Sequence, residues 1–225
     1  MIPVITIDGP SGVGKGTIGQ FLSQHFGWHF LDSGALYRLT ALAARRQGVS
    51  FDDAAALARI AADLPVEFKP QTAGELKIFL AGQDVSQDIR TEHVGNDASR
   101  VATVPAVRAA LLTRQRDFLR PPGLVADGRD MGTTIFPTAA VKIFLLASAE
   151  VRAQRRYKQL KDKGLSANLE CLYKEIAERD ERDRTRSASP LVAADDAVLI
   201  DTSQLGIEEV MAKVLAVCQQ RLGMQ

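Results

Sequence analysis

The sequence of 225 residues contains little cysteine or histidine, with two of the first and three of the second. Cys171 and Cys218 are far apart and lack a CxxC spacing, so we predict reduced structural thiols rather than a disulfide or metal site. His25 and His29 flank Trp28 near the end of a predicted helix, and structural roles are expected for the histidines. A bound transition metal is therefore not predicted.

The sequence also lacks an excess of charge of one sign and a long apolar run. Its 28 Lys and Arg balance 27 Asp and Glu, so no broad attraction for a nucleic acid polymer is expected. No stretch reaches the roughly 18 apolar residues of a membrane span, and the N-terminal segment has no basic leader pattern. We expect a cytoplasmic protein without membrane association, with 46% hydrophobic residues to build a core.

Short apolar runs, rich in β-branched residues, indicate the strands. They are uninterrupted rather than alternating, which is typical of parallel strands buried on both faces. Helical patterns lie between them, so an α/β three-layer fold is predicted, with a central five-stranded parallel sheet flanked by helices. The predicted strands are Val4–Ile7, Phe30–Leu31, Leu124–Ala126, Val141–Leu146 and Ala197–Ile200.

One stretch departs from this alternation. Val66–Lys69 and Leu76–Leu80 have strand character, with a turn at Gly74 between them and another over Ala81–Asp84 after them. This pattern predicts a small antiparallel β insertion. We therefore expect one domain over residues 1–225, with a core at 1–60 and 96–225, an insertion at about 61–95 and a lid at about 150–166.

A glycine-rich loop stands between the first strand and the first helical pattern, which is the context of a phosphate-binding P-loop. Its backbone N–H groups and the following helix N-terminus favour an anion, and Lys15 would bridge the β- and γ-phosphates of a nucleotide. Gly16 takes the place of the usual hydroxyl residue and Thr17 follows it, as in adenylate-kinase-like enzymes. The residues predicted to bind the nucleotide are Gly9, Pro10, Ser11, Gly12, Val13, Gly14, Lys15, Gly16 and Thr17.

The segment VADGRDMGT, residues 125–133, follows a buried strand. Asp127 stands where a P-loop enzyme needs a carboxylate for Mg²⁺ or its waters, with Thr17 as the second predicted metal-side residue. Arg129 and Asp130 then emerge at the carboxyl end of the sheet, where open α/β folds bind ligands. A surface ion pair between Arg129 and Asp130 is the alternative.

In the last third of the chain, a stripe of residues at helical spacing along one face of a predicted helix is apolar at first and charged further on. Charges on an inward face are costly unless a ligand or cleft receives them, so an anion-binding cleft is favoured over a solvated helix end. The stripe consists of Leu169, Leu172, Tyr173, Ile176, Arg179, Asp183 and Arg186.

A second basic run precedes a turn expected at Gly164. It suits a lid that closes over a triphosphate, with Arg155 contacting the nucleotide, although an exposed helix face would have the same composition. The run contains Arg152, Arg155, Arg156, Lys158 and Lys161.

With these motifs in order along nearly the whole chain, the sequence resembles the bacterial cytidylate kinase family. The specific elements are ADGRDMGT and ERDERDRTR, residues 126–133 and 178–186, while the P-loop is shared more widely. The resemblance implies transfer of the γ-phosphate of ATP to CMP or dCMP with Mg²⁺, no permanently bound cofactor, and a monomer with only small-molecule partners. A kinase for UMP, AMP or shikimate is the nearest alternative; a nucleotide switch is disfavoured because no N-K-x-D motif occurs.

The resemblance also implies residue roles. Lys15, Arg129, Arg186 and Asp127 would be catalytic, since a monophosphate oxygen needs no general base and catalysis is positioning and charge neutralisation. The implied acceptor contacts are Arg38 and Arg129 with Ser33 for the phosphate, Ser99, Arg108 and Asp130 for cytosine, Arg179 and Asp183 for the sugar, and Arg186 for phosphate or base.

Overall fold

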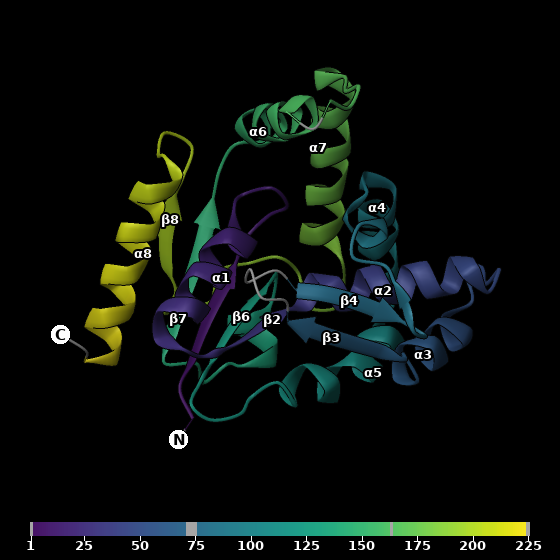
Figure 1. Cartoon of the computed structure of the whole chain (residues 1–225), viewed down its shortest axis with the longest axis horizontal. Helices are drawn as coiled ribbons and strands as arrows, with labels where there is room; N and C mark the ends of the chain where they lie inside the picture. The colour runs from purple at the N-terminus through teal and green to yellow at the C-terminus, as the bar shows by residue number, and fades with distance from the viewer. Residues whose placement is uncertain (1, 71–75, 163, 224–225) are drawn as a thin grey trace. The chain divides into compact units, whose positions relative to one another are not determined.

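The computed structural model describes residues 2–70, 76–162 and 164–223 (Figure 1). The chain forms two compact units, residues 1–32 with 115–225, and residues 33–114. The predicted single domain, with an insertion at about 61–95 and a lid at about 150–166, stays a prediction.

Five strands in the described part of the first unit form a parallel sheet in the order β2-β6-β1-β7-β8. This confirms the predicted sheet. Asp127 on β6 is in register with Ile7 on β1 and with Asp32 on β2, so the carboxyl ends of these strands lie at one edge. The strands are β1 (Val4–Asp8), β2 (His29–Asp32), β6 (Leu124–Gly128), β7 (Val141–Leu146) and β8 (Val198–Asp201).

Helices α1 (Lys15–Phe26) and α8 (Ile207–Leu222) contact each other and pack on β6 and β7. Their apolar stripes bury Ile18, Leu22 and Val214 against the sheet, as expected for amphipathic helices on a parallel sheet. Cys218 is a free thiol buried in this core, whereas Cys171 is exposed and also free.

Helices α6 (Ala149–Asp162) and α7 (Leu169–Thr185) pack on each other as a hairpin, visible in Figure 1. Ala153, Leu172 and Ile176 are the buried centre of their contact. The Asn168 side chain accepts a hydrogen bond from the Cys171 amide and so caps α7. A short π-helical segment, Met131–Ile135, follows β6.

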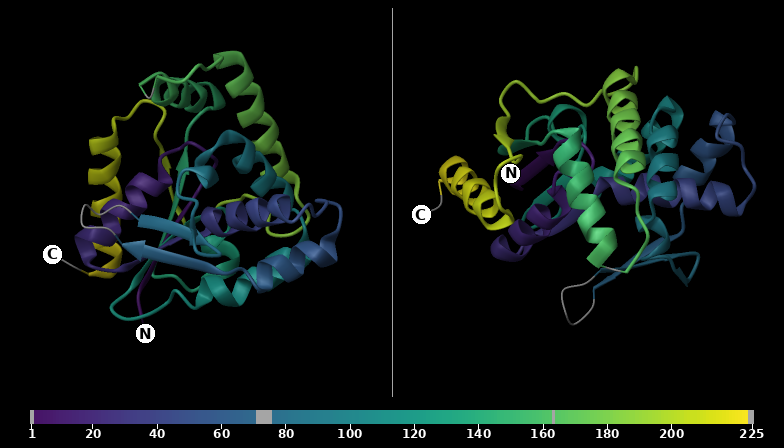
Figure 2. Two further views of the ribbon diagram at one scale, coloured as in Figure 1. Left: turned by 45° about the vertical axis from the view of Figure 1, so that its right-hand side comes forward. Right: turned by 90° about the horizontal axis from the view of Figure 1, so that it is seen from above.

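The second unit combines helices with a small antiparallel sheet in the order β3-β4-β5. Figure 2 shows β3 and β4 side by side in opposite directions, which confirms the predicted antiparallel insertion. Its elements are α2 (Ser33–Arg46), α3 (Ala54–Ala62), β3 (Val66–Pro70), β4 (Leu76–Leu80), β5 (Gln83–Asp84), a 3-10 turn (Asp88–Arg90), α4 (Glu92–Val101) and α5 (Pro105–Arg116), which begins there.

The turn predicted over Ala81–Asp84 was too long, because its last two residues form β5 on the edge of this sheet. A two-residue strand is too short to show the alternation that identifies strands. The turn predicted at Gly74 lies outside the described residues. Leu39 on α2, Ile78 and Leu80 on β4, and Val94 on α4 share the buried core of the unit.

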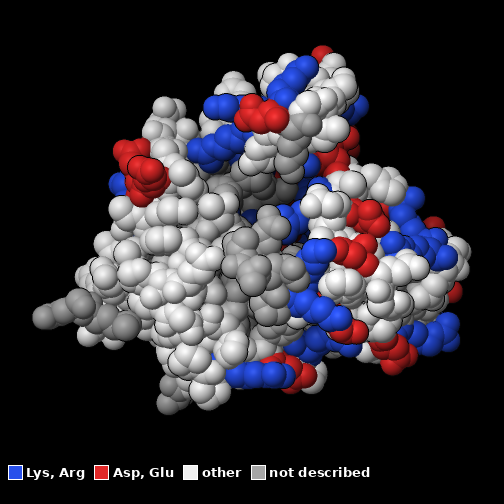
Figure 3. All heavy atoms as spheres, viewed as in Figure 1, with Lys and Arg blue, Asp and Glu red and all other residues white. Residues whose placement is uncertain are grey.

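Among the described residues, no helix combines the length and apolarity that a membrane crossing requires. Acidic and basic side chains are intermixed on the face shown in Figure 3.

Candidate active site

The glycine-rich loop connects β1 to α1 in a backbone conformation that its glycines make possible. Gly9 has a φ of 146°, and a Cβ there would lie 2.3 Å from the carbonyl oxygen of Leu145. Gly14 has a φ of 103° and directly precedes α1, so it adds no side chain over the first N–H groups of the helix. The loop and the helix N-terminus thus offer backbone donors to an anion.

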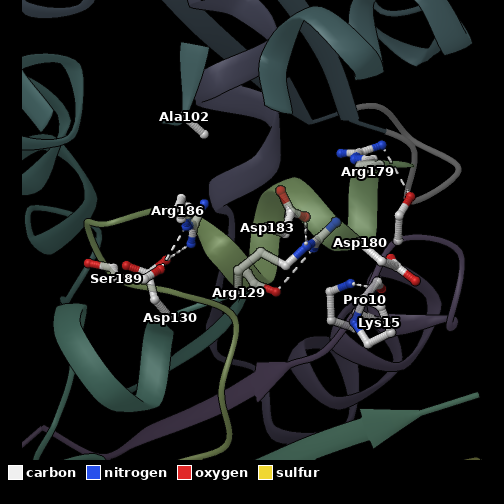
Figure 4. Close-up of polar contacts among 12 residues, drawn as sticks. Pro10, Lys15, Ala102, Arg129, Asp130, Arg179, Asp180, Asp183, Arg186 and Ser189 are labelled. Atoms are coloured by element: carbon white, nitrogen blue, oxygen red, sulfur yellow. Dashed lines mark hydrogen bonds and ion pairs between the residues drawn. The ribbon is translucent and has the colours of Figure 1, made fainter. Parts of the chain in front are cut away.

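Lys15 points back across this loop, as Figure 4 shows. Its Nζ donates a hydrogen bond to the Pro10 carbonyl at 2.8 Å and lies 4.0 Å from Oδ1 of Asp127. Burial, followed by the charge of Arg129, lowers the pKa of Lys15 to about 7, although Asp127 opposes this shift. The loop therefore holds a buried amine whose charge a phosphate would favour.

Asp127 closes the other side of the loop. Burial raises the pKa of this carboxyl to about 7, against the opposing effect of Lys15. A Cβ at Gly16 would lie 3.6 Å from Oδ2 of Asp127. The carboxylate therefore lies next to the first turn of α1, and no side chain at Gly16 stands between them. Thr17 is exposed. No group of three or more His, Cys, Asp and Glu among the described residues gathers as a metal cluster.

Arg129, which is partly buried, forms an ion pair with the buried Asp183. Nε of Arg129 donates to Oδ2 of Asp183 at 3.0 Å, and Nη1 donates to the Gly128 carbonyl at 3.2 Å. Burial alone would raise the pKa of Asp183, but Arg129 and then Arg179 outweigh it and lower the pKa. The pair fixes one face of the Arg129 guanidinium (Figure 4).

The end of α7 carries a second ion pair, and this one is buried. Nη2 of Arg186 lies 3.7 Å from Oδ1 of Asp130, and its Nε donates to the Ser189 carbonyl at 2.7 Å. Further up the helix, Nη1 of Arg179 donates to Oγ of Ser11 at 3.1 Å. Asp183 and Arg186 are buried, so the charged end of the stripe is not a solvated helix end.

Sequence reasoning missed Arg152. This residue of α6 is 3% exposed, donates to the carbonyls of Ser11 at 2.9 Å and Ala147 at 3.0 Å, and pairs with Asp180 on α7. Arg155, the predicted nucleotide contact, donates to Thr202 Oγ1 at 3.1 Å, and its contact with a nucleotide stays a prediction. Both arginines belong to the basic run, and the run alone gave no reason to prefer Arg152.

Asp8 was missed as well. It ends β1, directly before the glycine-rich loop, and is 4% exposed. Its two carboxylate oxygens accept the amides of Met131 and Gly132, each at 2.8 Å. The only sequence signal was a carboxylate at the end of an otherwise apolar strand.

The remaining predicted acceptor residues belong to the second unit. Arg38 donates to the Ile89 carbonyl at 2.7 Å. Arg108 lies 5.5 Å from the ring centre of Tyr37 and donates to the Ala102 carbonyl at 3.4 Å. Ser33 starts α2, Ser99 is on α4 and Arg108 on α5, and all three are buried.

Comparison with known proteins gives consistent matches. The family model described as cytidylate kinase matches residues 5–220. The protein named cytidylate kinase of Aeromonas salmonicida is 58% identical over 223 residues, covering 99% of this chain and 96% of that protein. Cytidylate kinase of Shewanella denitrificans is 58% identical over 95% of this chain and 94% of its own length. The cytidylate kinase of Proteus mirabilis is 57% identical, with 96% of each chain covered.

Among solved structures, a gluconokinase from Sinorhizobium meliloti is 18% identical with a TM-score of 0.48, covering 97% of this chain and 92% of that chain. Similarity at this level adds nothing to the sequence matches.

Proposed function

The chain belongs to the cytidylate kinase family, and from this premise we propose that it transfers the γ-phosphate of ATP to CMP or dCMP. The products are ADP and CDP or dCDP. The observation that carries this proposal is the family match across residues 5–220. The matched region includes the glycine-rich loop and the arginines described above, Arg129, Arg152, Arg179 and Arg186.

On the donor side, the backbone N–H groups between Gly9 and Gly14 would hold the phosphates of ATP at the start of α1. Lys15 would exchange its contact with the Pro10 carbonyl for the β- and γ-phosphates. Mg²⁺ usually binds one or two carboxylates together with substrate phosphates and waters. The buried Asp127, 4.0 Å from Nζ of Lys15, would be that carboxylate, and the Thr17 hydroxyl would face the ion. When bound, the ion supplies positive charge to the phosphates.

On the acceptor side of the first unit, Arg129 would hold the acceptor phosphate and Arg186 the phosphate or base. Asp183 and Arg179 would contact the sugar, and Asp130 would accept from the exocyclic amine of cytosine. The partly buried ion pair of Arg129 with Asp183 and the buried pair of Arg186 with Asp130 support these roles, because they hold both guanidinium groups in place. In the second unit, the resemblance assigns the remaining contacts to Ser33, Arg38, Ser99 and Arg108.

The reaction needs little chemistry from side chains. An oxygen of the acceptor phosphate bonds to the γ-phosphorus while the bond from that phosphorus to the bridging oxygen breaks, and ADP leaves with the electron pair. The acceptor oxygen is already ionised at neutral pH, so no general base is required. Lys15, Arg129 and Arg186 would neutralise the repulsion between the two anions.

The proposal extends to the setting of the enzyme. It acts as a cytoplasmic monomer on small-molecule nucleotides, with neither a nucleic acid polymer nor a membrane as partner. The charge balance of 28 basic and 27 acidic residues supports the absence of a polyanion partner.

A substrate panel tests the proposal. The purified protein is mixed with ATP, Mg²⁺ and each of CMP, dCMP, UMP and AMP, and the diphosphate formed is identified. Preference for CMP and dCMP is expected, and a preference for UMP or AMP would contradict the assignment of Asp130.

Two variants test the mechanism within this assay. Lys15→Met and Arg129→Ala should each lower turnover by about 10²–10³-fold, since each removes a charge aimed at the transferring phosphate. Arg184→Ala is the matched control, because Arg184 lies on α7 but is 62% exposed and pairs with Glu181 at the surface. Wild-type turnover in Lys15→Met or Arg129→Ala would refute the mechanism.

A further inference from the structure

Asp8 joins two segments that are far apart in the sequence. It is the last residue of β1, and the glycine-rich loop begins at the next residue. Oδ1 accepts the Met131 amide and Oδ2 accepts the Gly132 amide, each at 2.8 Å. These two amides directly follow Arg129 and Asp130, so Asp8 holds the turn that presents both side chains.

The turn needs an acceptor of this kind. The amides of Thr134 and Ile135 donate to the Asp130 carbonyl at 2.9 and 3.2 Å. The amides of Met131 and Gly132 come earlier in the segment, and they donate to Asp8 rather than to this carbonyl. Two adjacent N–H groups at a helix start are satisfied best by an anion with two acceptor oxygens. An asparagine would offer one acceptor and direct its NH₂ group at the second amide.

Close packing fixes the same turn against β1. A Cβ at Gly132 would lie 3.0 Å from Oγ1 of Thr6 on β1, and on the other side of the turn a Cβ at Gly128, the last residue of β6, would lie 2.7 Å from Cε of Met131. The backbone of the turn therefore lies directly on the strand that ends in Asp8. A change in this anchor is transmitted to Arg129 and Asp130, because the turn is closely packed and these residues directly precede the anchored amides.

The Asp8 carboxylate is retained at an energetic cost. Burial raises its pKa to about 6, although the two amides and Lys15 act in the opposite direction. Because burial disfavours the charged form of Asp8, stability alone does not explain a carboxylate at this position.

We propose that Asp8 is a positioning residue for the acceptor: by anchoring the Met131–Gly132 turn it places Arg129 and Asp130, and so sets the affinity for CMP and the discrimination of cytosine from uracil. This inference rests on the proposed function, since it deepens the role of the same site. The competing role is support of the glycine-rich loop, which would act on ATP instead.

The test compares the KM values for the two substrates in Asp8→Asn, which is nearly isosteric. The KM for CMP should rise roughly tenfold, as expected for loss of one charge-assisted hydrogen bond. The ratio of kcat/KM for CMP over UMP should fall, while the KM for ATP stays within about twofold, because the carboxylate of Asp8 bonds to the turn after Arg129 and Asp130. A rise confined to the KM for ATP, or no change in either, overturns the inference.

Gly132→Ala is a second variant that disturbs the same turn while the Asp8 carboxylate itself is unchanged. Its Cβ must displace Thr6 or the turn, so the same change in CMP affinity and selectivity is expected. Ile7→Val is the stability control, because it removes one buried methylene from the core cluster of the sheet, whose described members include no residue of the turn. Its KM for CMP should equal that of the wild type. If Ile7→Val reproduces the Asp8→Asn pattern, the effect is general destabilisation and the inference is wrong.

A measurement without substrate separates this inference from the proposed function. The Met131 and Gly132 amides should exchange with deuterium faster in Asp8→Asn than in the wild type. If the wild type does not phosphorylate CMP, the proposed function fails. If it does, while Asp8→Asn keeps slow exchange at these amides or an unchanged KM for CMP, the inference alone fails.

Discussion

At the scale of single residues, Lys15 connects burial to the pH dependence of nucleotide binding. Its pKa is lowered to about 7 without a ligand, so the amine loses its proton as the pH rises through neutrality. A bound triphosphate favours the charged form, and binding above the lowered pKa must take up a proton. The affinity for metal-free ATP should therefore fall from about pH 7 to about pH 10, the range between the lowered pKa and the ordinary value of lysine.

Isothermal titration in two buffers of different ionisation enthalpy measures the proton uptake directly. Lys15→Arg is the control, because a guanidinium stays protonated across this range. The ATP affinity of Lys15→Arg should depend on pH only through Asp127, whose pKa is raised to about 7. Equal pH dependence in the wild type and Lys15→Arg would show that Lys15 is charged throughout.

The missed residues make their contacts with residues far away in the sequence, whereas the glycine-rich loop could be predicted from neighbouring residues. Gly9, Gly14 and Lys15 could be predicted because the loop is a local pattern whose glycines are required by its backbone. Asp8 contacts Met131 across 123 positions, and Arg152 contacts Ser11 across 141 positions. No local pattern encodes such a contact, so only the folded chain reveals it.

At the scale of elements, the α6–α7 hairpin is linked to the glycine-rich loop by hydrogen bonds that Arg152 and Arg179 donate to Ser11. Arg152 is 3% exposed, contacts the Ser11 carbonyl and pairs with Asp180, which is 13% exposed. Removing one partner of a buried pair costs about 3–5 kcal/mol of stability because the other charge stays buried. Arg152→Ala should therefore lower the melting temperature and raise the KM for ATP.

Thermal unfolding and steady-state kinetics on the same preparation check both effects. Lys158→Ala is the matched control, since Lys158 is an exposed residue of the same helix. If Arg152→Ala melts at a lower temperature but keeps its KM for ATP, the pair supports the fold without positioning the loop.

The elements themselves could largely be predicted from the sequence, whereas their arrangement could not. The uninterrupted apolar runs gave the five parallel strands, because strands buried on both faces have no polar alternation. The order β2-β6-β1-β7-β8 depends on pairing between distant strands, such as β1 with β6. The short edge strand β5 was missed since two residues show no period.

At the scale of the whole molecule, the proposed contacts divide unequally between the two units. The donor loop, Lys15 and Asp127 belong to residues 1–32 and 115–225, while proposed acceptor residues occur in both units. Binding slows local opening where the ligand makes contacts, and hydrogen exchange reports this region by region. CMP should therefore slow exchange in the second unit, at the start of α2 around Ser33 and in α4 around Ser99, and also around Arg129.

A nonhydrolysable ATP analogue should slow exchange around the glycine-rich loop and the start of α1, with little effect on residues 33–114. AMP at the same concentration is the control, because a weak acceptor should leave both units close to the free protein. Protection by CMP that stays within residues 33–114 would exclude Arg129 and Asp130 as acceptor contacts. Protection confined to the first unit would exclude Ser33, Arg38, Ser99 and Arg108 instead, so either outcome shows which half of the acceptor assignment is wrong.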